Sequence, residues 1–85
     1  MDPIIVPTAT PQEIAVVAGS HYPIRAEDQN LILKEKLDGA FESLSENGTI
    51  TAGETKTVVF NSRRVQLSVA SGTGKVYVSK SKVSN

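Results

Sequence analysis

The sequence contains no cysteine, which excludes disulfide bonds and thiolate metal sites as ways of reinforcing a small protein. It also lacks tryptophan, and its four aromatic residues are Tyr22, Phe41, Phe60 and Tyr77. Aromatic side chains bury the largest apolar areas, so a core with so few of them is thin. A chain of 85 residues forms one domain and buries only about 60–65% of its unfolded surface. Stability must come from close packing or from oligomerisation, and we expect oligomerisation.

Long apolar runs are missing as well. No stretch approaches the roughly 20 apolar residues that a membrane helix requires. The chain starts Met1-Asp2-Pro3, and the apolar residues 4–6 are too few for the core of a signal peptide. We therefore expect a soluble protein, made in the cytoplasm, that has no membrane partner.

Acidic residues are absent beyond Glu54. Residues 1–54 hold all nine acids and three bases, a net charge of −6, and residues 55–85 hold only bases, a net charge of +6. These six bases are Lys56, Arg63, Arg64, Lys75, Lys80 and Lys82. Such asymmetry points to partners. Three interpretations stay open: the halves fold against each other, the acidic half docks on the basic half of a neighbour, or the basic half binds a polyanion.

Prolines at positions 3, 7 and 11 set the character of the first twelve residues. Each proline fixes φ, removes a donor and keeps the preceding residue extended, so the segment is neither a helix nor a central strand. The sequence predicts an extended arm over residues 1–12. Because Ile4, Ile5 and Val6 are too apolar to favour water, we expect the arm to lie across another surface, either its own or that of a neighbour.

Residues 13–18, EIAVVA, are too few for periodicity to separate a strand from one turn of helix, although Val16 and Val17 favour a strand. Residues 21–25 read as a loop around Pro23.

Residues 28–44 have the pattern of an amphipathic helix. Asp28 is a suitable N-cap. Apolar residues then recur at i, i+4, i+7, i+8 and i+11 as one stripe: Leu33, Leu37, Ala40, Phe41 and Leu44. Gly39 within such a helix costs up to about 1 kcal/mol relative to alanine, so we expect it to mark close packing or a kink. Residues 45–48, which include Asn47-Gly48, would end the helix.

Residues 49–82 contain short β-branched runs separated by turn residues. Val65, Leu67 and Val69 alternate with small or polar side chains, as in a half-buried strand. Turns of two to four residues predict an antiparallel meander of hairpins. The predicted fold is α+β and mostly β: the arm, then a single small domain over residues 13–85. That domain would combine a helix at about 28–44 with a β-meander at about 49–82, as a small sandwich or half-barrel.

Candidates for chemistry are few. His21 is the only histidine, and no companion residues suggest a triad or a metal site. The segment Gly72-Thr73-Gly74-Lys75 departs from a phosphate-binding loop, because Val69 stands at the first glycine position and Val76 at the Ser/Thr position. We read it as a hairpin turn. The sequence predicts no catalytic residue, no metal and no cofactor, and hence no enzyme.

The segments GTITAGETKTVVF and VQLSVASGTGKVYVS resemble small β-domains in the structural proteins of tailed bacteriophages, which show a T-x-x-A-G-E-T turn and a V-x-V-S-x-G-x-G-x-V-x-V hairpin. The resemblance covers about 35 residues. It implies a virion component, synthesised in the host cytoplasm: a capsid decoration (cement) protein or a head, neck or tail accessory subunit.

The first hypothesis is therefore a non-enzymatic structural protein that forms a homo-oligomer or binds other virion proteins. Its partner-binding residues would be Ile4, Ile5 and Val6 in the arm and Arg63, Arg64 and Lys75 in the basic half. An alternative is a nucleic-acid or polyanion-binding β module that uses the same three basic residues. Another is a small regulatory protein that docks on a partner.

Overall fold

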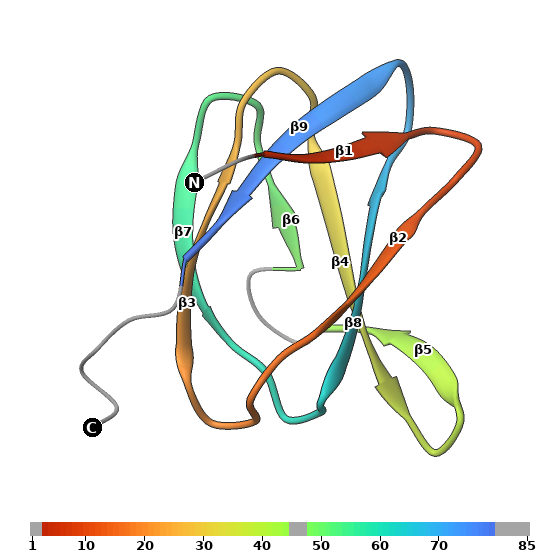
Figure 1. Cartoon of the computed structure of the whole chain (residues 1–85), viewed down its shortest axis with the longest axis vertical. Coiled ribbons are helices and arrows are strands. Elements are labelled where there is room, and N and C mark those ends of the chain that lie inside the picture. Colours follow the sequence, from red (N-terminus) through yellow and green to blue (C-terminus); the bar gives the residue numbers. More distant parts are fainter. Residues whose placement is uncertain (1–2, 45–47, 80–85) are drawn as a thin grey trace.

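The computed structural model describes residues 3–44 and 48–79, and these residues form nine β-strands and no helix (Figure 1). The first sheet has the strand order β1 (Ile4–Pro7), β9 (Thr73–Val78), β3 (His21–Ala26) and β7 (Thr55–Val59). The second sheet has the order β2 (Gln12–Ala15), β8 (Arg64–Val69), β4 (Leu31–Leu37) and β5 (Ala40–Ser43), and β6 (Thr49–Ile50) also pairs with β4. All described pairings are antiparallel. The described part of the chain has no helix long and apolar enough to cross a membrane.

The hydrophobic core lies between the two sheets. In β3 and β8 every second side chain is buried, as expected where one face of a strand packs inward and the other meets water. Phe60 is the largest fully buried side chain, and its ring centroid lies 6.0 Å from that of Tyr22. The Tyr22 hydroxyl accepts a hydrogen bond from the Val17 N–H at 2.7 Å, so its polar end is satisfied.

The predicted helix over residues 28–44 is wrong. This segment forms β4 and β5, joined by a two-residue turn at Asp38 and Gly39. Both turn residues have positive φ, 52° and 84°, which is the conformation of a type I′ hairpin turn and the reason for glycine here. Asp28 is no helix cap, since its carboxylate accepts a hydrogen bond from the Lys75 N–H at 3.0 Å. Of the residues expected to end the helix, 45–47 lie outside the described part.

The predicted N-terminal arm is also wrong. Residues 4–7 form β1, an edge strand paired with β9 from Ile4 opposite Val76 to Pro7 opposite Thr73. The side chain of Val6 has no exposed surface and belongs to the core. The prolines do suit an edge strand, where a missing N–H breaks no interior ladder. Ile4 and Val6 therefore pack within the chain itself, whereas Ile5 stays largely exposed.

The predicted meander over residues 49–82 is wrong in its pairing, although strands do form in residues 49–79; residues 80–82 lie outside the described part. β7 pairs with β3, β8 with β2 and β4, and β9 with β1 and β3, so consecutive strands pass from one sheet to the other. Residues 70–72 therefore join the two sheets and are not a hairpin turn, and Thr73, Gly74 and Lys75 already belong to β9. Glycine is needed at position 74 because a Cβ there would lie 2.9 Å from Cγ1 of Val69.

The segment expected to be a loop around Pro23 is β3, a central strand. Pro23 is tolerated because its nitrogen faces the end of β9, where the ladder stops. Its carbonyl still accepts a hydrogen bond from the Ser79 N–H at 3.0 Å. The run at residues 13–18 does contain a strand, β2.

Candidate functional site: a projecting hairpin

The partner-binding residues expected near the N-terminus have three different environments. Val6 is fully buried, Ile4 is partly buried against the core, and Ile5 is 47% exposed. Of the three, Ile5 alone presents much of its side chain to solvent, on the outer face of the first sheet opposite Lys75.

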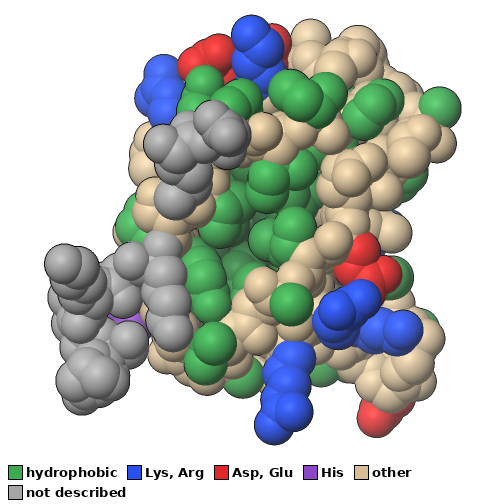
Figure 2. Space-filling model, in the orientation of Figure 1, with side chains coloured by type: hydrophobic (Ala, Val, Ile, Leu, Met, Phe, Trp, Pro, Cys, Tyr) green, Lys and Arg blue, Asp and Glu red, His purple; other side chains and the backbone are tan. Residues whose placement is uncertain are grey.

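The expected basic residues do not form one surface. Arg64 points outward from the second sheet and forms an ion pair with Glu13, whereas Lys75 lies on the first sheet. Arg63 is exposed in the turn before β8. Figure 2 shows Lys and Arg side chains at opposite ends of the molecule, with hydrophobic side chains gathered between them. Each sheet contains strands from both halves of the chain, so the charge split along the sequence is not a split in space.

The titratable residues considered in the sequence are His21 and the acidic side chains. His21 is exposed at the start of β3, opposite Val59. Within residues 3–44 and 48–79, no group of three or more His, Cys, Asp or Glu side chains is placed to hold a metal ion.

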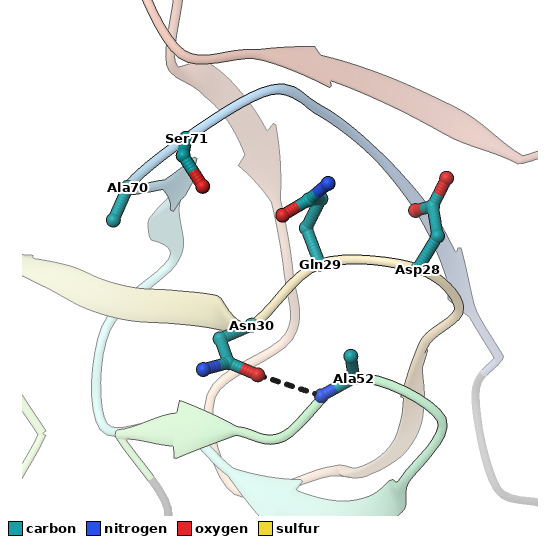
Figure 3. Close-up of a pocket in the computed structure, with 6 residues that line it drawn as sticks. All are labelled: Asp28, Gln29, Asn30, Ala52, Ala70 and Ser71. Carbon is teal, nitrogen blue, oxygen red and sulfur yellow. Dashed lines mark hydrogen bonds between the residues drawn. The ribbon is translucent and has the colours of Figure 1, made fainter.

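A small polar depression lies between the loops at one end of the sandwich (Figure 3). Its lining residues are Asp28, Gln29, Asn30, Ala52, Ala70 and Ser71. The volume is about 160 Å³, below the roughly 300–1,000 Å³ of most small-molecule sites. Two of its polar side chains already connect loops, because Asn30 Oδ1 accepts a hydrogen bond from the Ala52 N–H at 2.9 Å and Asp28 binds the Lys75 N–H. Asp28 and Asn30 thus hold neighbouring loops together through hydrogen bonds.

The β4–β5 hairpin is the feature that stands out from the body of the sandwich. Figure 1 shows β5 and the end of β4 extending beyond the other strands. We call residues 36–43 the projecting ribbon. Leu37 is 40% exposed at its tip, opposite the exposed Ala40. Phe41 is half-buried on the other face, with the Lys36 ammonium 5.8 Å from its ring centroid.

The base of the ribbon is anchored to the turn between β7 and β8. The buried carboxylate of Glu35 accepts a hydrogen bond from the Asn61 N–H at 2.8 Å, and the Ser62 hydroxyl donates to the Lys36 carbonyl at 2.6 Å. Beyond this anchor β5 pairs with β4 alone. The arrangement gives the ribbon a fixed direction while leaving both of its faces open to a partner.

Sequence reasoning missed this ribbon because it assigned the segment to a helix. The signal that could have found it is Asp38-Gly39 between residues of alternating character, the strongest short-range indication of a hairpin.

Comparison of the chain with protein family models, with curated proteins and with solved structures found no match.

Proposed function

We propose that this chain is a non-enzymatic structural subunit that assembles with neighbouring copies of itself through the projecting ribbon. The ribbon is the observation that carries the proposal. An isolated two-stranded hairpin is at best marginally stable in water, and residues 36–43 extend past the pairing of β4 with β8, which ends at Glu35 opposite Val65. Within the described residues, nothing pairs with the outer edge of β5.

The apolar residues of the ribbon support an assembly role. Among the described residues, Leu37 is one of four large hydrophobic side chains with high exposure, the others being Ile5, Val17 and Val59. Burying a leucine side chain contributes roughly 1.5–3 kcal/mol, so its transfer into a contact with a neighbour favours assembly. The ribbon also carries charges of both signs, from Lys36, Asp38 and Glu42, which suits a protein neighbour better than a polyanion.

The resemblance to tailed-phage β-domains supports the proposed setting through its turn motif, because the segment expected as a hairpin has its two strands in different sheets. The subunit would belong to a virion, as a capsid decoration protein or as a head, neck or tail accessory subunit. The turn that carries part of the resemblance is stabilised locally, since Glu54 accepts a hydrogen bond from the Thr51 N–H at 3.1 Å and returns one from its own N–H at 2.9 Å.

Replacing Leu37 with aspartate is expected to lower the assembly's mass without unfolding the chain. The substitution places a carboxylate where the contact needs an apolar group, and burial of an unpaired charge is strongly unfavourable. Sedimentation velocity measures the mass, and circular dichroism checks the β-structure.

Val17→Asp is the matched control, because Val17 is 51% exposed and lies outside the ribbon. We expect this variant to assemble like the unaltered chain. Equal masses for the Leu37→Asp variant and the unaltered protein would rule out the ribbon as the contact.

A further inference from the structure

The open edges of the two sheets differ in how well they are protected against pairing with another strand. In natural proteins, prolines, charged side chains or short strands at a sheet edge prevent it from pairing with a strand of another molecule. β1 is flanked by Pro3 and ends in Pro7, and β6 has two residues. The four-residue strands β2 and β5 carry Glu13 and Glu42.

β7 lacks these protections. Its five residues, Thr55 to Val59, are β-branched except for Lys56, and they include no proline and no acid. β7 is the last strand of its sheet, and no described segment pairs with its other edge. Lys56 places no charge at this edge that would oppose pairing with another strand, because its ammonium lies toward the second sheet and donates a hydrogen bond to the Thr49 carbonyl at 3.2 Å.

The backbone groups that β7 offers can be assigned from its pairing with β3. The Ala26 N–H donates to the Glu54 carbonyl at 3.1 Å. Because hydrogen bonding in an antiparallel pair alternates, Lys56 and Val58 then bond to β3. The N–H and C=O groups of Thr55, Thr57 and Val59 point away from the sheet.

We propose that β7 pairs with β7 of a second copy, antiparallel and about a two-fold axis at Thr57, so that the two first sheets become one continuous sheet. This register places Thr57 opposite itself and Thr55 opposite Val59, and it pairs every outward backbone group of the strand. It also covers Val59, which is 45% exposed on the outer face. An axis at Lys56 would set two lysines opposite each other, and an axis at Val58 would shorten the overlap.

The pairing is independent of the ribbon, and the two contacts can be separated by experiment. The starting protein is the Leu37→Asp variant, in which the ribbon contact is removed. We expect it to sediment as a dimer. Adding Thr57→Lys or Thr57→Glu should abolish this dimer, because like charges would meet at the axis. Thr57 has an exposed side chain, so both variants should keep the circular dichroism of their parent.

An equimolar mixture of the lysine and glutamate variants is expected to restore the dimer, because the axis then joins opposite charges. Added salt should weaken the restored dimer. The proposal is overturned if the Leu37→Asp variant is a monomer, if either charged variant still dimerises alone, or if the mixture stays monomeric. Failure of the ribbon proposal looks different: Leu37→Asp would then leave the mass of the unaltered protein unchanged, whether or not the Thr57 variants reduce it.

Discussion

Replacing Phe60 with alanine is expected to lower the free energy of unfolding by about 3–5 kcal/mol. Phe60 is the largest fully buried side chain and lies between β7 and β8, where the chain passes from one sheet to the other. Alanine would lose its contact with Tyr22 and leave a cavity between the sheets. Because domains are stable by only about 5–15 kcal/mol, this one change removes much of the margin. Urea unfolding followed by circular dichroism measures the loss.

Phe41→Ala is the matched control, since it removes the same atoms from a half-buried position on the ribbon. We expect the free energy of unfolding to fall by well under half of the fall for Phe60→Ala, because the ring of Phe41 is not part of the core between the sheets. Comparable losses for the two variants would contradict the placement of the core between the sheets.

The second large effect separates a sheet from a helix over residues 28–44. Leu33 is fully buried in β4, whereas Leu37 is 40% exposed at the ribbon tip. Leu33→Ala should therefore lower the free energy of unfolding by about 2–5 kcal/mol. In the unassembled chain, at low protein concentration, Leu37→Ala should change it by about 0.5 kcal/mol or less. A helix would place both leucines on one apolar stripe and make the two losses similar.

Leu31 gives an independent check of the same point. It lies off the helical stripe, yet in β4 it is fully buried beside Ile50. Leu31→Ala is expected to cost as much as Leu33→Ala. A loss as small as that for Leu37→Ala would favour the helix and contradict β4. Urea unfolding at one ionic strength serves for all three variants.

Local strand formation could be predicted where the pattern of period two was clean. The alternation at Val65, Leu67 and Val69 predicts a half-buried strand, and β8 is that strand, with all three side chains buried. Pairing could not be predicted in the same way. Short turns usually join neighbours in one sheet, but here the chain crosses between sheets after β7 and again after β8. The distinction depends on long-range contacts that no local segment specifies.

The helix was predicted because two periodicities coincide in residues 28–44. Leu33, Leu37 and Phe41 recur every four residues, as in a helix. Leu33 and Leu37 also fit the alternation of one strand, whereas Phe41 follows the turn and lies on the other face of the ribbon. The decisive residue is Gly39, since its cost in a helix becomes an advantage in a turn with positive φ. Tertiary context then selects the strand, because Leu31 and Leu33 complete the core opposite the first sheet.

The sequence interpretation missed the candidate site because it assigned the ribbon to a helix. The residues expected to bind partners were selected for apolarity or charge in segments read as arm and meander. Folding buries Val6 in the core and joins Arg64 to Glu13. The exposed apolar residues that remain, such as Leu37 and Val59, become candidates only when the edges and the ribbon are known.

The proposed function depends on the ribbon, and hence on residues 31–43 forming the β4–β5 hairpin. The most direct test is to measure nuclear Overhauser contacts over these residues in the isotope-labelled chain. With Leu37 and Ala40 closing the two-residue turn as a hydrogen-bonded pair, Lys36–Phe41 and Lys34–Ser43 are the closely spaced, non-hydrogen-bonded pairs. The account predicts strong Hα–Hα contacts within both of these pairs. Medium-range contacts between residues i and i+3 along residues 31–44, without the cross-strand contacts, would show a helix and contradict the account.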